Sequence, residues 1–162
     1  MTKQIPLTQG KFALVDDEDY DYLMQWKWTL LGGKYAHRKI RIGKRIYNKS
    51  TTIIMHRLIA KTPDGYHTDH INGDTFDNRK ENLRICKARE NLRNQKTRSS
   101  IKSSKFKGVY YSKVSKKWVA QITNDFGMQY LGLHETQESA AKAYNLAAVK
   151  YFGEYARLNI IE

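Results

Sequence analysis

The sequence has little of what several protein classes require. It holds one cysteine, Cys86, among 162 residues, which excludes an intramolecular disulfide framework and a cysteine-rich zinc site. No apolar run approaches the roughly 18 residues that a membrane-spanning helix needs. The first ten residues also lack the apolar core of a signal peptide. We therefore expect a cytoplasmic protein without a membrane partner.

Acidic residues are scarce relative to basic ones. Lysine and arginine together number 29 against 16 aspartates and glutamates, so the formal net charge is +13. An excess of this size on a small chain predicts a polyanionic partner, with nucleic acid first and an anionic membrane surface second. A solvated basic face without a partner stays open as an alternative. The length suits one ordinary domain or two small ones.

Residues 1–54 predict a small sheet with one short helix. A run of acidic residues would cap a helix that ends near Gln25. Gly32-Gly33 predicts a tight turn between strands over residues 26–31 and 34–42. The basic residues that follow the turn make either a DNA-contacting surface or a charged, solvated edge strand. The candidate DNA contacts are Arg38, Arg41 and Arg45.

Polar residues that suit hydrolytic chemistry gather between residues 67 and 95. The pattern predicts a strand, a tight turn at Asn72-Gly73, a second strand over 83–86 and a short helix from Ala88. Such a ββα unit would bring together Asp69, His70, Asn82 and Asn91. Histidine is the side chain best suited to act as a base near neutral pH. Carboxylate and amide oxygens suit Mg²⁺ or Mn²⁺ rather than zinc, and the alternating ligand order of an EF-hand is absent.

This group of residues, with Met55-His56-Arg57-Leu58-Ile59 before it and Asn82-Leu83-Arg84 within it, resembles the HNH motif of phage and intron homing endonucleases. The resemblance covers about residues 55–95. It implies His70 as the general base and Asp69 and Asn91 as ligands of one divalent cation, Mg²⁺ or Mn²⁺. It implies that Asn82 completes the catalytic group by holding the loop and fixing the His70 ring.

Two departures from the motif and several structural alternatives accompany this interpretation. The third letter is Asn91 rather than histidine, and Lys87 stands where a serine or threonine would cap the final helix. A lone Asp–His pair is more often a surface hydrogen bond, and lone asparagines are more often caps. His56 is expected to fall off the apolar face of its helix, and its role, like that of His67, stays open.

The C-terminal third has a different pattern. Residues 96–104 predict a basic linker, and residues 105–160 predict three strands and a helix. The expected strands cover residues 106–111, 117–123 and 128–133. Thr136 would cap a helix that runs to about Phe152, with Gly153 just past its end.

Residues 105–111, 117–123, 130–133 and 140–148 resemble the plant APETALA2-type DNA-binding domain. The resemblance implies a three-stranded sheet whose exposed face enters the major groove, backed by one helix. The contact positions that it carries over are Lys107, Tyr110, Lys113, Trp118, Gln121, Thr123 and Tyr130. Several of these are arginine or tryptophan in plant proteins, so the plant target sequence does not transfer. Core packing for Trp118 and Tyr130, and solvation for the lysines, remain alternatives.

The sequence therefore predicts an α+β chain: an N-terminal small sheet, a ββα-metal nuclease unit, and a three-stranded antiparallel sheet on a helix. The expected divisions are residues 1–54, 55–95, 96–104 and 105–160. The predicted function is a homing-type endonuclease acting on double-stranded DNA in a bacterial or phage-infected cell, with a monomer favoured. A DNA-binding regulator with a decayed nuclease centre and an RNA-binding structural protein are the alternatives. One HNH centre favours cutting a single strand unless two chains assemble.

Overall fold

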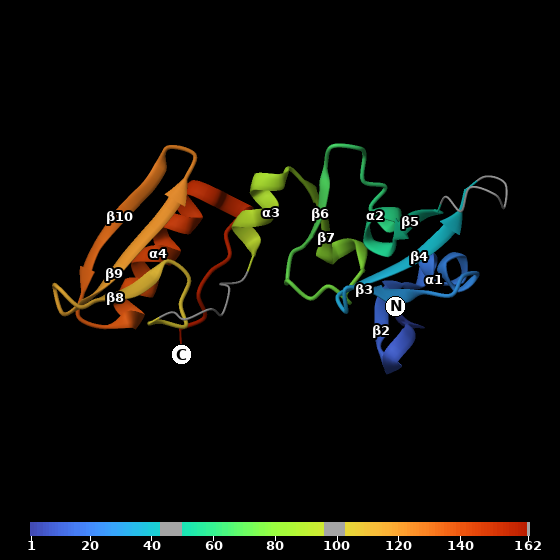
Figure 1. Cartoon of the computed structure of the whole chain (residues 1–162), viewed down its shortest axis with the longest axis horizontal. Helices are drawn as coiled ribbons and strands as arrows, with labels where there is room; N and C mark the ends of the chain where they lie inside the picture. The colour runs from blue at the N-terminus through green and yellow to red at the C-terminus, as the bar shows by residue number, and fades with distance from the viewer. Residues whose placement is uncertain (43–49, 96–102, 162) are drawn as a thin grey trace. The chain divides into compact units, whose positions relative to one another are not determined.

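The structure, a computed structural model, describes residues 1–42, 50–95 and 103–161. Among these residues the strands form four small antiparallel sheets, two of three strands and two of two strands, with helices between them. The α+β prediction is therefore confirmed. The chain divides into two compact units, residues 1–91 and 92–162, which are described one at a time (Figure 1). No helix in the described ranges is long and apolar enough to cross a membrane.

Two sheets open the first unit. β1 (Thr2–Pro6) pairs with β2 (Phe12–Asp16) across a short 3-10 turn, η1 (Thr8–Gly10), and α1 (Asp17–Met24) follows. In the next sheet, β4 (Tyr35–Arg41) lies between β3 (Thr29–Leu31) and β5 (Ser50–Ile54). Gly32 and Gly33 connect β3 to β4 with φ of 57° and 70°. Both angles are positive, as the predicted tight turn requires and as glycine adopts without strain.

One apolar core joins these elements. The Trp28 side chain is 1% exposed, and its indole Nε1 donates a hydrogen bond of 2.8 Å to the Leu23 carbonyl oxygen. The polar edge of this buried ring is therefore satisfied. The five-residue helix α2 (Met55–Ile59) adds its apolar ends to the core. The core residues are Ile5, Leu7, Ala13, Val15, Leu23, Trp28, Ala36, Met55 and Ile59.

A second hairpin and a helix follow α2. β6 (His67–His70) pairs antiparallel with β7 (Leu83–Cys86) across a loop that includes the 3-10 turn η2 (Lys80–Asn82), and α3 (Ala88–Asn94) comes next. The predicted ββα order is therefore correct. Lys87 offers no oxygen to cap the first amides of the helix, but the reciprocal bond is present: Glu90 Oε2 accepts from the Lys87 backbone N–H at 2.6 Å. This is one half of a capping box. Cys86 is buried, and burial raises the pKa of its thiol to about 11, as expected of a packed residue.

The N-terminal sheet holds the loop between β6 and β7. The Leu14 amide donates to the Phe76 carbonyl, and the Leu14 carbonyl accepts from the Asn78 amide, both at 2.8 Å. The Asp16 carboxylate accepts from the Lys80 amide at 2.8 Å. Strand β2 thus satisfies backbone groups of a loop that is remote from it in sequence.

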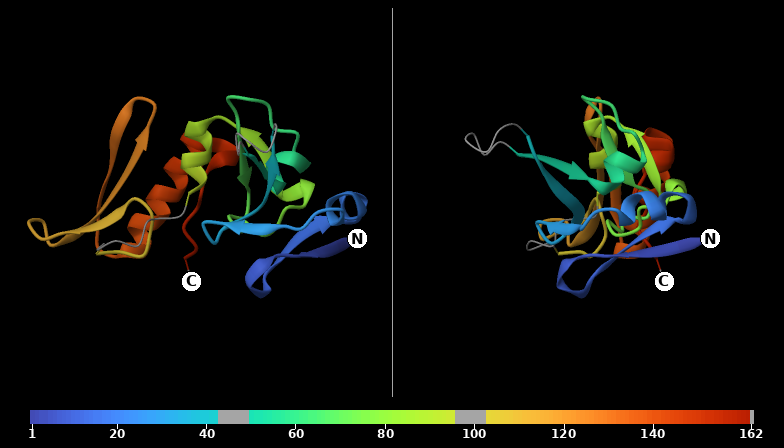
Figure 2. Two further views of the ribbon diagram at one scale, coloured as in Figure 1. Left: turned by 45° about the vertical axis from the view of Figure 1, so that its right-hand side comes forward. Right: turned by 90° about the vertical axis from the view of Figure 1, so that its right-hand side faces the viewer.

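The second unit is a three-stranded sheet on one helix. β9 (Lys117–Asn124) lies between β8 (Val109–Ser112) and β10 (Gly127–His134). α4 (Gln137–Phe152) and the 3-10 turn η3 (Gly153–Tyr155) complete it. The first strand begins at Val109 rather than at residue 106, because Phe106 packs into the core and is 4% exposed. α4 lies along one face of the sheet (Figure 2).

Small side chains let α4 approach the sheet closely. Ala140 and Ala141 pack with Val109 and Ala120, while Ala147 and Ala148 pack with Ile122 and Tyr144 in an adjoining cluster. A Cβ atom at Gly108 would lie 2.1 Å from the Tyr144 ring, so only glycine fits there. The Thr136 hydroxyl accepts from the Ser139 amide at 3.1 Å, and Gly153 has a φ of 53°. Both predicted ends of the helix are thereby confirmed.

The division of the chain at residues 54, 95 and 104 stays a prediction. The expected linker over residues 96–104 falls mostly outside the described residues, since only 103 and 104 are within them.

Candidate functional site

The last two residues of β6 carry the candidate catalytic side chains. Asp69 and His70 are 6% and 5% exposed, and they pair across the hairpin with Arg84 and Leu83. Directly after them the chain turns: the Gly73 amide donates to the His70 carbonyl at 2.8 Å, and Gly73 has a φ of 74°. The predicted strand and tight turn therefore place Asp69 and His70 at the mouth of a loop.

Asn82 closes that loop at its neck. Its Oδ1 accepts from the Asn72 amide at 2.9 Å, and its Nδ2 donates to the Asp77 carbonyl at 2.7 Å. The Asn72 side chain in turn donates to the Asp77 carboxylate at 3.0 Å. A single buried amide thus joins two parts of the loop.

The His70 ring is oriented by Asn78, a residue that the sequence analysis did not assign. His70 Nε2 lies 3.4 Å from Asn78 Oδ1, and Asn78 Nδ2 donates to the Phe76 carbonyl at 3.1 Å. The second bond fixes which end of the amide faces the ring. Because an amide oxygen only accepts, the proton of a neutral His70 is placed on Nε2, which leaves the lone pair on Nδ1. This tautomer suits a proton acceptor.

The electrostatic surroundings keep His70 uncharged. Burial lowers the pKa of His70, while the Asn78 contact and the charges of Asp69, Asp74 and Asp77 oppose that shift. A neutral imidazole is the form that can take a proton from water. His70 therefore has the protonation state and the tautomer of a general base near neutral pH.

Two further rings enclose His70. The His56 ring lies edge-on to it, with centroids 4.9 Å apart, and the Tyr35 ring is roughly parallel to it at 6.3 Å. His56 lies outside the apolar core cluster and packs against the rings of Tyr35 and His70. His56 is 7% exposed, because the helix has only five residues and packs on several sides. Burial first, and then the charges of His70 and Arg57, lower the pKa of His56 to about 3.

Asp69 is held by an ion pair. Its Oδ2 accepts from Arg84 Nε at 3.0 Å and from Arg84 Nη2 at 2.7 Å, and the two side chains are 7% and 12% exposed. The pair lies directly across the β6–β7 hairpin. A buried carboxylate without such a partner would be costly. Arg84 therefore neutralises Asp69 within the protein.

The residues suit one hard cation supported largely by water and substrate. Asp69 offers a carboxylate and Asn91, half-buried on α3, offers an amide oxygen. Within the described ranges, no group of three or more His, Cys, Asp or Glu side chains could hold a metal ion. Mg²⁺ is commonly bound by one or two protein oxygens together with waters and phosphate oxygens, so this sparse set fits it. It does not fit zinc, which needs more nitrogen or sulfur ligands.

The candidate DNA contacts of the N-terminal sheet differ from one another. The Arg38 guanidinium carbon lies 4.0 Å from the Trp26 ring centroid, and Arg38 Nε is buried without a hydrogen-bond partner among the described residues. Arg38 therefore packs on an aromatic ring. Arg41 is exposed at the end of β4. Arg45 lies outside the described residues.

The candidate DNA contacts of the C-terminal sheet also differ from one another in exposure and in their partners. Tyr110, Thr123 and Tyr130 are exposed and Gln121 is half-buried, and the strand register places all four on one face of the sheet. Lys113 is exposed between β8 and β9. The Lys107 ammonium donates to the carbonyls of Arg93 and Gln95 at 2.5 and 2.9 Å, so it is engaged within its own unit.

Trp118 belongs to the opposite face. It packs against the core cluster under α4, and its ring lies 5.2 Å from that of Tyr111. The core-packing alternative therefore describes Trp118 better than a DNA contact does. The partial alternation of β9 did not settle this, because small Ala120 stands between Val119 and Gln121 on the face that packs against α4.

Asn78, Arg84 and His56 are the site residues that sequence reasoning left without a role. Asn78 lies in a polar loop where any asparagine resembles a turn residue. Arg84 becomes informative only once the hairpin register places it opposite Asp69. The sequence signal for both was their position beside the candidate motif in Asp77-Asn78-Arg79 and Asn82-Leu83-Arg84.

Comparisons with known proteins identify two similarities. The profile of the HNH endonuclease family matches residues 55–93. Over 160 residues the chain is 29% identical to an uncharacterized HNH endonuclease of Acanthamoeba polyphaga mimivirus, covering 95% of this chain and 78% of that protein.

A shorter similarity concerns plant proteins. A stretch of 58 residues, 35% of this chain, is 43% identical to an ethylene-responsive transcription factor of Arabidopsis thaliana and to an AP2-like ethylene-responsive transcription factor of the same plant. The stretch covers 14% and 17% of those proteins, so the likeness is to one segment of each. This chain therefore carries an HNH endonuclease domain at residues 55–93, together with a segment similar to part of AP2-type transcription factors.

Proposed function

We propose that this chain is a sequence-directed, homing-type endonuclease that hydrolyses phosphodiester bonds of double-stranded DNA. The central observation is His70, buried, uncharged and oriented by Asn78, next to Asp69 in the sequence of β6. The match of residues 55–93 to the HNH endonuclease family supports the same chemistry.

Each residue of the site has a separate task in this proposal. His70 takes the proton of the attacking water at Nδ1, while Asn78 holds the ring and Asn82 holds the loop. Asp69 and Asn91 would hold one Mg²⁺ or Mn²⁺. That cation, when bound, stabilises the negative charge that develops on the phosphate and the leaving oxygen. Arg84 compensates the Asp69 charge and orients its carboxylate.

The second unit supplies recognition in this proposal. Its sheet would enter the major groove, while exposed basic residues such as Arg41 and Lys113 contact phosphates. The similarity to transcription factors supports this role for the segment concerned. A monomer with one HNH centre would cut one strand, and two assembled chains would cut both.

Nicking of supercoiled plasmid by the purified full-length chain tests the proposal. With Mg²⁺ or Mn²⁺ we expect conversion to open circles, and excess EDTA should stop it. His70→Ala should lower the rate by about 10²–10⁴-fold, the usual contribution of a general base, with DNA affinity retained. Binding without cleavage by the parent chain would instead indicate a DNA-binding regulator whose nuclease centre has decayed. Undiminished nicking by His70→Ala would remove His70 from the mechanism.

A further inference from the structure

The register of the C-terminal sheet defines which side chains face away from α4. On β9, Ala120 and Ile122 pack into the clusters beneath α4. Side chains alternate along a strand, so Val119, Gln121 and Thr123 face the other way. Directly paired residues share a face. The pairs Tyr110↔Val119, Tyr130↔Gln121 and Met128↔Thr123 therefore place three more side chains on the outer face.

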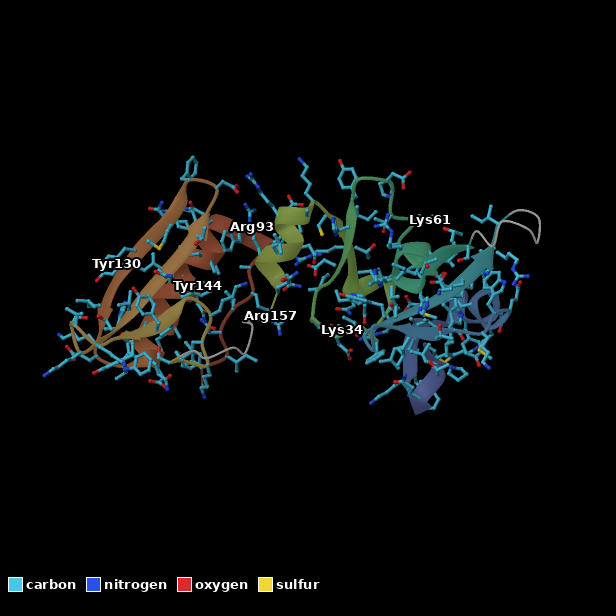
Figure 3. All side chains as sticks on the ribbon, viewed as in Figure 1. Lys34, Lys61, Arg93, Tyr130, Tyr144 and Arg157 are labelled. Carbon is cyan, nitrogen blue, oxygen red and sulfur yellow. The ribbon has the colours of Figure 1, made fainter. Side chains whose placement is uncertain are left out.

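The centre of this outer face carries no charge. Its central residues are Tyr110, Val119, Gln121, Thr123, Met128 and Tyr130, of which Val119 is buried. By the same register Leu133 and Lys117 also face outward, and Lys117, at the start of β9, is paired with Glu135. Met128 and Tyr130 are 65% and 62% exposed, and Tyr110 is 42% exposed. A continuous set of exposed apolar and aromatic side chains marks a surface that meets a partner. Figure 3 labels Tyr130 on β10 and Tyr144 on α4, which covers the opposite face of the sheet.

The only amide on the outer face is available for recognition. In the described part of the chain, nothing hydrogen-bonds the side chain of Gln121 or Thr123, although the Gln121 backbone amide donates to the Gly108 carbonyl. Gln121 lies on the central strand, with Tyr130 directly across from it on β10. A primary amide with both a donor and an acceptor thus stands in the middle of an apolar face.

Basic residues lie next to strands β8 and β9 of this sheet. Lys113 and Lys116 are exposed in the turn between β8 and β9, and Lys105 is exposed before β8. Lys117 is paired with Glu135 at 2.6 Å. With a net charge of +13 for the chain, these basic residues favour a polyanion. Three strands about 4.8 Å apart also match the roughly 12 Å width of the DNA major groove. The occupant that fits is double-stranded DNA.

We infer that this face selects an A·T base pair through Gln121 and disfavours guanine at that position. The Gln121 side chain would make two hydrogen bonds to adenine: its oxygen would accept from N6–H, and its nitrogen would donate to N7. Met128 and the methyl group of Thr123 are apolar neighbours suited to the thymine methyl group. Guanine is commonly read by arginine or lysine. Neither stands beside Gln121 on this face, since Lys117 lies at the far end of β9 and is paired with Glu135. The inference rests on the proposed recognition role of the second unit.

Binding-site selection from random double-stranded DNA tests this assignment. The full-length chain with His70→Ala serves as the parent, because it should bind without cutting. We expect a selected site with a fixed A·T pair. Gln121→Ala should reduce the preference at that pair by about 5- to 150-fold, the discrimination that a bidentate contact provides. Gln121→Arg should change the selected base to guanine, and Gln121→Glu should move it toward cytosine.

Gln129→Arg is the matched control. Gln129 pairs with Ile122, so it lies on the face toward α4. The substitution adds the same positive charge as Gln121→Arg, on the neighbouring strand but on the opposite face. It should leave the selected sequence unchanged, with folding checked by circular dichroism. A parent site with guanine at the discriminating pair, or a site that Gln121→Arg does not alter, would overturn the inference while leaving the nuclease proposal intact. A parent that selects no double-stranded DNA would overturn the recognition role itself.

Discussion

Replacing Arg84 with methionine probes the ion pair that holds Asp69. The two side chains are 12% and 7% exposed, and both contacts go to the same Asp69 oxygen. Methionine keeps much of the volume and leaves a buried carboxylate without its partner. Breaking one side of a buried pair costs about 3–5 kcal/mol. Because Arg84 retains some exposure, we expect the lower end, about 3 kcal/mol of unfolding free energy.

Urea unfolding in excess chelator, followed by tryptophan fluorescence, measures this loss. Trp28 is 1% exposed in the core of the first unit. With Trp118→Phe in every variant, the signal comes only from Trp26 and Trp28 of that unit. The control is the double variant Arg84→Met with Asp69→Asn, which removes both charges and should recover most of the lost stability. An Arg84→Met variant as stable as the parent, or a double variant no more stable than the single one, would refute the reasoning.

The same variants report on the cation. A ligand that binds only the folded state adds about 2.7 kcal/mol of stability at a hundred times its dissociation constant. We expect Mg²⁺ to stabilise Arg84→Met more than the parent, because the guanidinium no longer shares the Asp69 carboxylate. The addition of Asp69→Asn should abolish that gain. Equal stabilisation of all three proteins would mean that the cation binds elsewhere.

Three further predictions address the loop, its acid stability and the two units. Asn78→Ala frees the His70 ring and should lower the nicking rate about tenfold, the worth of one hydrogen bond, without weakening DNA binding in a gel-shift assay. A hydrogen bond from Arg79 lowers the pKa of Asp77. The ionised Asp77 carboxylate therefore stabilises the fold above the unfolded-state pKa of about 3.9, and this stabilisation is lost as pH falls through the lower folded-state pKa. Asp77→Asn should reduce this loss of stability in acid, as measured by thermal melts. A fragment of residues 101–162 should bind DNA without cutting, and residues 1–98 should nick with poorer site choice; an identical cleavage map for 1–98 and the whole chain would assign selection to the first unit.

The elements that could be predicted from sequence are those with local signals. α4 has a capping threonine, a terminal glycine and a run of alanines, and each acts within one or two turns of the helix. The turn that follows β6 is predicted by Asn72-Gly73. These signals depend on backbone conformations that few residues adopt, so they survive without any knowledge of tertiary contacts.

The features that could not be predicted depend on register and long-range packing. The Asp69–Arg84 pair exists because the loop aligns two strands at one particular offset, and nothing in the intervening sequence fixes that offset. The burial of His56 beside His70 could not be predicted, because a five-residue helix gives too little periodicity to define a face. Trp118 looked available because β9 carries apolar residues on both faces, so alternation alone could not tell the two sides apart.

The hydrogen bonds between Leu14 and the loop after β6 mean that the HNH motif is shorter than the stretch of chain needed to fold it. The family match begins at residue 55, yet the backbone of Phe76 and of Asn78 finds its partners on β2. A graft of residues 55–93 onto another scaffold would leave those backbone groups unpaired. It would also remove the support of Asn78, the residue that orients the His70 ring. The smallest transplantable nuclease from this chain therefore has to include the strand that carries Leu14, and insertions between the N-terminal sheet and the motif are tolerated only where they leave that strand free to reach the loop.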